Sequence, residues 1–392
     1  MKRISDKLNC TAGYSLVQFV TWSYYAIVLA FASNVLYEFG FSDSRISLFM
    51  GIFTALSVAV QVAAGELLSR IKKWDVAGVL VLFGAVMLLC AAVVLLPDCN
   101  RILAVGAFGV ICMLLQTLPS LANSMGMDSI RRGAPTDYSI ARGIGSLGYS
   151  VTALLTGVLV RRLGVAAIHM LTIGVSVLLI LSAVWYRRTI RDLAEAESEE
   201  NRESKGHFFS RYPRFAVFLF GMAFLCVSHG LLCNFMFQIM TSRGAGAMEQ
   251  GVATSISSLV ELPIMFGFPF MLKKLRCDKW VRIAGFCMML KPLLILLANA
   301  PGGIYLAQAT QSLGYGLGVI GSVYFAERVV VQGESIRAQS YHGAVTTVST
   351  VLALSMGGVL IEYLGVQTMV MVSLGCSLVG AVIVLFAAQK TE

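Results

Sequence analysis

The chain has 392 residues, of which 57% are hydrophobic and 13% charged, and its mean hydropathy is +0.78. Soluble domains carry about 25% charged residues, so this composition excludes a water-soluble fold. The formal net charge of +9 could favour nucleic acid, but the positions of the basic residues indicate membrane orientation instead. Nine scattered cysteines without a C-x-x-C pair imply neither a disulfide framework nor a metal site, and no cofactor is expected.

Long apolar runs recur along the whole chain, and a bilayer core needs roughly 20 helical residues for each crossing. The first run follows Met1-Lys2-Arg3 but is too long for the apolar core of a signal peptide, so we expect it to be retained as the first helix. The pattern predicts an all-α membrane protein with twelve transmembrane helices, near 12–37, 46–68, 76–97, 102–127, 138–160, 165–186, 214–238, 249–272, 281–299, 303–326, 338–361 and 366–388.

The basic residues divide unevenly between the two sides of these predicted spans. Of 30 Lys and Arg residues, 24 fall on the side that holds the N-terminus. The exceptions are Lys291, inside a span, and five on the other side: Arg45, Arg101, Arg161, Arg162 and Arg243. This is the positive-inside pattern, which places both termini in the cytoplasm of a cell (inner) membrane protein and indicates no nucleic-acid partner.

One long charged stretch, 187–213, separates six spans from six and is poor in residues that build a core. An internal repeat supports this division, because the segment 157–165 recurs as 358–366 at a constant offset of 201 residues. We therefore predict an N-terminal six-helix bundle over 1–186, a cytoplasmic linker over 187–213 and a C-terminal six-helix bundle over 214–392. Two such parallel halves are typical of secondary transporters.

Small residues are dense in the predicted fifth span. They are Gly143, Gly145, Gly148 and Gly157, with Ser146 and Ser150 among them. Small residues let transmembrane helices approach closely, so we interpret them as a packing face.

Ionisable side chains inside a bilayer are costly unless they are paired or wetted, so each is a functional hypothesis. Glu261 lies near the middle of the eighth span, where burial disfavours its charged form and suits a group that alternately holds and releases a proton. Lys291 in the ninth span is too deep to reach the interface easily and is the natural partner of Glu261. His229 in the seventh span reaches a similar depth. Structural pairing of Glu261 with Lys291, and a core hydrogen-bonding role for His229, are the alternatives to proton coupling.

A second group of polar residues could contact a solute or open and close the path to it. Asp128 and Arg142 face each other across a short turn, either lining a cavity, forming a cytoplasmic gate or making an interfacial ion pair. The remaining candidates could equally be interhelical hydrogen-bonding residues; they are Gln18, Trp22, Tyr25 and Asn34 in the first span, Gln61 in the second, Gln116 and Asn123 in the fourth and Tyr149 in the fifth.

The segment Ala141-Arg142-Gly-Ile-Gly145-Ser-Leu-Gly148-Tyr149 resembles the fifth helix of major facilitator superfamily transporters in the branch of sugar–proton symporters and phenylpropionate-type permeases. That resemblance implies that Arg142 binds solute and that Tyr149 stacks on it. Three shorter segments are similar to the same branch: Glu261-Leu-Pro263, Ala284-Gly285 followed by Lys291, and Ser228-His229. The branch's Glu in the eighth helix takes part in binding or coupling, which the resemblance implies for Glu261.

Two departures from the family pattern limit what the resemblance implies. The loop after the second span reads Gly65-Glu-Leu-Leu-Ser69-Arg70, with Ser69 in place of the Asp that usually latches the cytoplasmic side. We therefore expect a rebuilt or absent latch and assign gating to Arg70 and Asp128. The tenth span has Leu313-Gly314-Tyr315 where the branch often has Leu-His-Gly, so a lactose-type proton site is incomplete.

These patterns predict a monomeric secondary active transporter that moves a small solute by alternating access between two bundles, with a central site and proton symport through Glu261, Lys291 and His229. Its partners are then the solute, protons and the lipid bilayer. The alternatives are a proton-driven efflux antiporter and a non-transporting membrane sensor of the same fold. An enzyme is not expected, because no H-E-x-x-H or comparable constellation occurs.

Overall fold

The computed structural model describes residues 2–70, 75–96, 99–131, 136–190, 208–331 and 335–390, with side chains from residue 10 onward except at 65–70, 127–131, 139, 269 and 335–337. All regular structure within these ranges is helical. The chain divides into two compact units, which are described separately below. Unit 1 comprises Met1–Glu197 with Gly246–Ser255, and unit 2 comprises Ser198–Ala245 with Ile256–Glu392. Most of the predicted linker, residues 191–207, lies outside the described residues.

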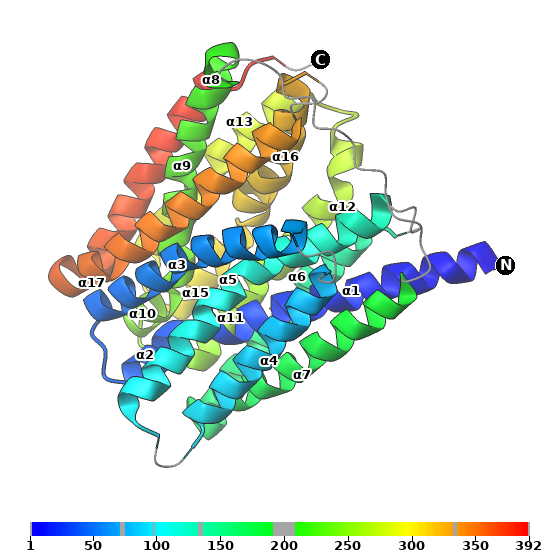
Figure 1. Cartoon of the computed structure of the whole chain (residues 1–392). Coiled ribbons are helices and arrows are strands. Elements are labelled where there is room, and N and C mark those ends of the chain that lie inside the picture. Colours follow the sequence, from blue (N-terminus) through cyan, green and yellow to red (C-terminus); the bar gives the residue numbers. More distant parts are fainter. Residues whose placement is uncertain are drawn as a thin grey trace. The chain divides into compact units, whose positions relative to one another are not determined.

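Unit 1 is built from long apolar helices, coloured blue to green in Figure 1. Asp75 caps the start of α4 by accepting a hydrogen bond from the Gly78 amide at 2.9 Å, and Asp137 caps α6 by accepting one from the Ile140 amide at 3.1 Å. α1 packs against α6 and α7, and α4 packs against α5 and α7. The bounds are α1 Lys2–Val28, α2 Ala32–Glu38, α3 Asp43–Arg70, α4 Val76–Val94, α5 Arg101–Arg131, α6 Tyr138–Leu163 and α7 Ala166–Thr189.

Unit 2 is divided into a larger number of helices, several of them short, which are coloured green to red in Figure 1. α9 packs along α17, and α13 packs against both α16 and α17. The bounds are α8 Phe208–Arg211, α9 Pro213–Asn234, α10 Met236–Thr241, α12 Leu262–Met271, α13 Cys277–Cys287, α14 Leu290–Leu297, α15 Pro301–Ala309, η1 Ser312–Gly316, α16 Leu317–Val329 and α17 Ser335–Ala387. α11, Ala247–Leu259, gives its first part to unit 1 and its last part to unit 2.

Ten helical stretches in the described ranges are long and apolar enough to cross a membrane. The last of them, Ala338–Ala387, contains a non-helical residue at Gly365 that divides it into two crossings. A further stretch, Pro301–Val329, is interrupted by the π-helical turn η1 and supplies another crossing. The predicted all-α membrane fold with twelve transmembrane helices in two bundles is thus the fold of the chain.

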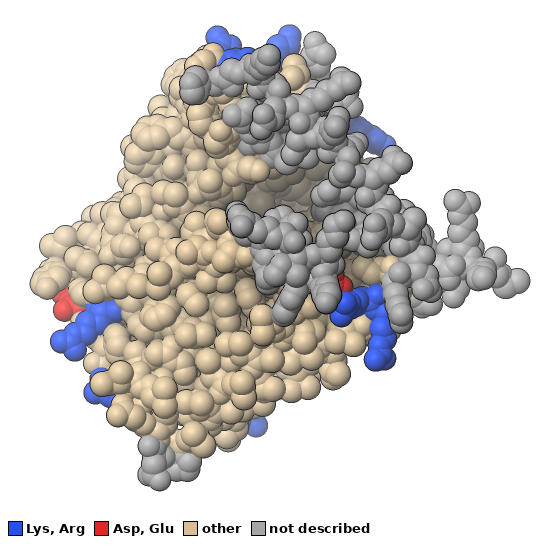
Figure 2. Space-filling model, in the orientation of Figure 1, with Lys and Arg blue, Asp and Glu red and all other residues tan. Residues whose placement is uncertain are grey.

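The surface agrees with a lipid environment. Large apolar side chains such as Ile102 and Phe386 are 82% and 81% exposed. Figure 2 shows the face in view covered mainly by residues other than Lys, Arg, Asp and Glu. An exposed apolar surface of this kind marks contact with a membrane or a partner, and the lengths of the helices fit a membrane.

The repeated sequence segments share a backbone conformation that the sequence alone only suggested. Gly164 ends α6 with φ 73° and ψ −172°, and Gly365 interrupts α17 with φ 83° and ψ 161°. Both glycines occupy the same position in the repeat. A positive φ strains residues that carry a Cβ, so the two glycines allow the same sharp connection between consecutive spans in each unit.

The small residues predicted to form a packing face do so at three positions of α6. A Cβ on Gly145 would lie 2.6 Å from the Trp22 ring, and one on Gly148 would lie 2.8 Å from the backbone oxygen of Phe19 in α1. A Cβ on Gly157 would lie 2.7 Å from the backbone oxygen of Ala247. These glycines allow backbone contact between helices, as small residues commonly do in membranes.

Candidate proton and solute sites

Three of the membrane-spanning stretches of unit 2 are interrupted near their middle. The breaks fall at residues 260–261 between α11 and α12, 288–289 between α13 and α14, and 310–311 between α15 and η1. A Cβ on Gly316 would lie 3.0 Å from Cγ of Glu261, and one on Gly314 would lie 3.2 Å from Cα of Met288. The π-helical turn therefore packs directly against both other breaks, and the three interruptions meet. Discontinuous helices and π turns frequently form ion and solute sites in transporters.

Glu261 and Lys291 are joined through the side chain of Gln311 at this meeting point. The Gln311 amide nitrogen donates to Oε1 of Glu261 at 2.8 Å, and its oxygen accepts a hydrogen bond from Nζ of Lys291. The three residues are 8%, 5% and 6% exposed. The predicted partnership of Glu261 with Lys291 therefore runs through an amide that the sequence analysis did not single out. A buried carboxylate and ammonium held in one hydrogen-bonded chain are sustained only by such pairing.

The predicted third member, His229, lies on the other side of Lys291. Nζ of Lys291 is 3.7 Å from Sγ of Cys233, which in turn lies 3.4 Å from Nε2 of His229. The His229 ring stacks on Tyr315 of η1 with 3.4 Å between ring centroids and 5° between the planes. Tyr315 directly follows Gly314, which stands where the branch often has a His. An aromatic ring here covers His229 instead of supplying a second imidazole.

A cavity of about 10 Å³ lies beside this cluster, with His229, Lys291, Gln311 and Tyr315 in its wall. That volume holds about one water molecule. The ionisable groups are therefore close to a space that a water could occupy while remaining covered by protein. Such a site can pass a proton but has no room for a solute in this conformation.

Unit 1 brings most of the predicted solute-contacting residues together. The guanidinium of Arg142 lies over the Trp22 ring at 4.1 Å from its centroid and donates to Oγ of Ser146 at 3.2 Å. The Trp22 ring also approaches those of Tyr25 and Tyr149, with centroid separations of 5.5 and 6.5 Å. A cation stacked on an aromatic ring and flanked by two phenols presents charge, planar apolar surface and hydroxyl groups in one place.

A network of amides and phenols positions Trp22. Its Nε1 donates to Oε1 of Gln18 at 3.1 Å, and Nε2 of Gln18 contacts Tyr14 Oη at 2.7 Å and donates to Oδ1 of Asn123 at 3.0 Å. Asn123 also accepts a longer bond of 3.4 Å from Tyr138. Gln18 is fully buried, so its orientation is fixed by these partners. The structure thus connects Gln18 and Asn123, two predicted residues, to Arg142 through Trp22.

Other predicted residues take different places. Tyr25 donates to Oε1 of Gln116, and Nε2 of Gln116 donates to Thr54 at 3.1 Å, which links α1, α3 and α5. Gln61 makes no side-chain hydrogen bond to any part of the chain that the structure describes, and its contact with a solute stays a prediction. The side chains of Asp128 and Arg70, predicted to gate the path, lie outside the described residues, as does the suggested pairing of Asp128 with Arg142.

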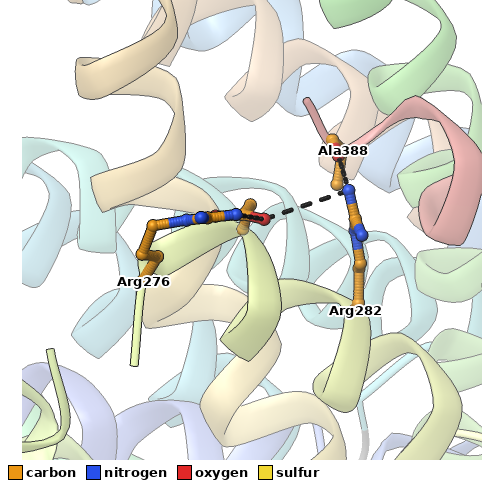
Figure 3. A network of polar contacts seen from close by, with 4 residues as sticks. Arg276, Arg282 and Ala388 are labelled. Carbon is orange, nitrogen blue, oxygen red and sulfur yellow. Dashed lines mark hydrogen bonds and ion pairs between the residues drawn. The ribbon is translucent and has the colours of Figure 1, made fainter. Parts of the chain in front are cut away.

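The start of α13 carries a second charged network, shown in Figure 3. Asp278 is 1% exposed and accepts hydrogen bonds from Nε and Nη2 of Arg276 at 3.0 and 3.1 Å. Arg282, one turn further along, lies 3.9 Å from the same carboxylate and donates to the carbonyl of Ala388 just beyond α17. The hydrogen bonds to Asp278 raise the pKa of the Arg276 guanidinium, so its charge is fixed. This network joins the start of α13 to the end of α17.

The chain matches the MFS_1 like family over residues 12–372, which is most of its length. The chain belongs to that family. No curated protein sequence matched it. As a member of this family with the helices described above, the chain is a multi-pass membrane transporter.

Solved structures of major facilitator transporters resemble this member of the MFS_1 like family in fold. The nucleoside transporter NupG has a TM-score of 0.72 at 13% identity, covering 98% of this chain and 100% of that chain. A bacterial homologue of the iron transporter ferroportin in an inward-facing state has a TM-score of 0.71 at 13% identity, covering 99% of each chain. A POT family transporter in complex with 5-aminolevulinic acid has a TM-score of 0.69 at 13% identity, covering 97% of this chain and 96% of that chain. These similar proteins are transporters rather than enzymes.

Sequence reasoning missed three residues of the unit 2 site and two of the unit 1 network. Gln311, Cys233 and Tyr315 carry no charge at neutral pH and so give no signal from the cost of burying a charge. Gln311 is one of two amides in its apolar span, with Gln308, and it lies at the place where the helix breaks. Tyr14 and Tyr138 gave no signal beyond being aromatic residues at the ends of predicted spans.

Proposed function

We propose that this family member is a secondary active transporter that moves a small solute by alternating access, driven by proton symport. Within this proposal residues 1–186 and 214–392 are the two six-helix halves joined by 187–213. The protein is a monomer in the cell inner membrane with both termini in the cytoplasm and binds no nucleic acid. Its resemblance to the branch of sugar–proton symporters and phenylpropionate-type permeases belongs to the same proposal.

The observation that carries the proposal is the hydrogen-bonded chain Glu261–Gln311–Lys291 at three meeting helix breaks. Two opposite charges buried together balance each other, but protonation of Glu261 would leave the Lys291 ammonium without its counter-charge. An unpaired ion in a low-dielectric interior costs several kcal/mol. Proton uptake must therefore be accompanied either by an anionic or dipolar group that approaches Lys291 or by a conformational change that wets it. Either response couples the proton to a second event.

Hydrogen bonding gives Gln311 a part in this coupling. As long as Glu261 is ionised it accepts the amide N–H of Gln311, whose oxygen then accepts from Lys291. Once Glu261 is protonated it can also donate, so an orientation with the Gln311 oxygen toward Glu261 becomes possible. A rotation of Gln311 would release Lys291 toward Cys233 and His229, which lie on its other side. We assign proton binding to Glu261 and the response to Lys291, with His229 beside it.

We place solute contact at Arg142, Trp22, Tyr25 and Tyr149 of unit 1, positioned by Gln18 and Asn123. The support is the stacked guanidinium and the surrounding rings. The solved structures of similar fold include a nucleoside transporter, a bacterial homologue of the iron transporter ferroportin, and a POT family transporter with 5-aminolevulinic acid bound. Small polar solutes, including aromatic acids and nucleosides, are therefore the classes to test first.

The test is proton flux in proteoliposomes that contain purified protein and an internal pH-sensitive dye. Sugars, aromatic acids, nucleosides and small peptides are added outside one at a time, with no gradient imposed. A symported solute carries protons inward and acidifies the lumen. We expect at least one solute to do so with wild type and with Glu38→Gln, a matched exposed carboxyl, but not with Glu261→Gln.

Other outcomes separate the competing functions. Alkalinisation of the lumen on adding solute outside indicates antiport, and the efflux alternative would replace symport. A solute that raises the unfolding temperature but moves no protons in any variant indicates a sensor. Equal proton flux in wild type and Glu261→Gln would show that the proton site is elsewhere.

A further inference from the structure

A second cavity in unit 2 has a wall of unusual chemistry. It measures about 10 Å³, and its lining includes Met222 and Cys226 of α9, Met288 at the end of α13, and His342 and Thr346 of α17. Two thioethers, one thiol and one imidazole thus line the same small space. It is distinct from the cavity beside Lys291, although Met288 and Tyr315 belong to both walls.

The imidazole of His342 has an unused nitrogen. Its Nε2 is buried and has no hydrogen-bond partner among the residues that the structure describes. A buried polar atom left without a partner costs about 1–3 kcal/mol. A buried nitrogen without a partner in the wall of a cavity suggests that a bound ion or molecule occupies the space.

The three sulfur-carrying residues, Met222, Cys226 and Met288, line the cavity together. Sδ of Met288 lies against Gly318, a cavity-lining residue, at 3.8 Å from where a Cβ would stand. Cys226 of α9 and Thr346 of α17 both line the cavity. Met222 and Cys226 are one turn apart on α9 and are 4% and 7% exposed. Soft donors therefore reach the cavity from three segments, α9, the break after α13, and α17.

A water molecule is the simplest alternative occupant, but it needs two to four polar partners. The wall offers Nε2 of His342 and two hydroxyls, that of Tyr315 and that of Thr346, which already donates to the His342 carbonyl. The remaining lining is sulfur or aliphatic. Thioether and thiolate sulfur with imidazole nitrogen is the donor set preferred by soft monovalent ions such as Cu⁺.

The composition of the set argues against Zn²⁺. No group of three or more His, Cys, Asp or Glu residues assembles in the described part of the chain, and Zn²⁺ sites are built from those residues. The single positive charge of a monovalent ion can also be balanced by one ligand of this set. If Cys226 loses its proton to the buffer as the ion binds, thiolate and ion together are neutral, so no net charge is buried.

We propose that this cavity is a binding site for a soft monovalent metal ion, Cu⁺ or its analogue Ag⁺, held by His342, Cys226, Met222 and Met288. The binding reaction exchanges the Cys226 S–H bond for an S–metal bond and releases one proton, so charge is conserved. The proposed ligands are other residues than Glu261, Gln311 and Lys291, although Met288 also lines the cavity beside Lys291.

The test uses Ag⁺ and the purified full-length chain in detergent. Reduced glutathione is present in excess to strip Ag⁺ from single cysteines, and the metal retained after desalting is counted by mass spectrometry. Met222→Leu combined with Met288→Leu removes two donors at nearly constant volume while keeping all nine cysteines. Met170→Leu combined with Met371→Leu, at two exposed positions, is the matched control.

We expect wild type and the control pair to retain about one Ag⁺ per chain, and the Met222/Met288 pair to bind it more than about 100-fold more weakly. Calorimetry in two buffers should show release of about one proton per ion. His342→Gln is the second variant if the paired substitution reduces expression, and it should lose the ion as well. Equal retention in all variants, or none in wild type, would overturn the proposal, because the binding would then be adventitious at thiols or absent.

Discussion

At the scale of single residues, the site depends on how two buried charges are accommodated. Glu261 and Lys291 could be predicted, because an ionisable side chain inside an apolar span is costly and therefore conspicuous. Gln311 could not, because a neutral amide within a span has the same appearance whether it joins two helices or bridges two charges. The structure distinguishes these cases by placing both amide atoms on charged partners.

Replacing Gln311 with Leu should destabilise the protein, because Glu261 and Lys291 each lose a hydrogen bond while remaining buried. We expect a loss of about 1–3 kcal/mol, visible as a lower unfolding temperature of the purified protein. Gln308→Leu is the matched control, since this buried amide one turn away donates only to the sulfur of Met236 in the described structure. Equal losses in the two variants would contradict the bridging role.

Replacing Arg142 with Lys should weaken solute binding while the charge is kept. Lys cannot reproduce the flat stacking of the guanidinium on Trp22, which contributes roughly 1 kcal/mol and so a several-fold change in Kd. The measurement is the solute-induced shift in unfolding temperature, with the solute that the flux assay identifies. Arg162→Lys, an exposed change at the end of α6, should leave the shift as in wild type; an unchanged shift in Arg142→Lys as well would remove Arg142 from the site.

At the scale of secondary structure, the positions of the spans follow from hydropathy, but their interruptions do not. Pro263 and Pro292 lie next to two breaks and hint at them, since proline removes a helix hydrogen bond. The π-helical turn Ser312–Gly316 has no such marker. It depends on tertiary contacts, because its glycines allow the turn to approach Glu261 and Met288.

Small residues on α6 provide a direct test of helix packing. Gly148→Ala should destabilise the protein by about 1–3 kcal/mol, because its Cβ would stand 2.8 Å from the Phe19 backbone oxygen and α1 would have to move. Gly174→Ala is the control, since a Cβ there meets nothing within 4 Å in the helix α7. We expect this control to be neutral or slightly stabilising, because alanine favours helix. An unchanged stability of Gly148→Ala in the same unfolding assay would show that close contact between α1 and α6 does not stabilise the protein.

At the scale of the whole molecule, composition alone excluded a soluble fold, span counting predicted twelve transmembrane helices, and the linker with the internal repeat predicted two halves. The repeat of 157–165 at 358–366 could be found in the sequence. The structure adds that its two equivalent glycines, Gly164 and Gly365, share the same positive-φ conformation. The choice of solute could not be predicted, because it depends on which groups face a binding space rather than on where helices cross the membrane.

The central claim is that Glu261 carries the proton that drives transport. The most direct test compares two modes of solute movement in proteoliposomes, accumulation driven by an imposed proton gradient and equilibrium exchange of labelled for unlabelled solute. We predict that Glu261→Gln, which keeps the shape but cannot ionise, loses gradient-driven accumulation and retains exchange, whereas Glu38→Gln retains both. Gradient-driven accumulation at the wild-type level in Glu261→Gln would contradict the account.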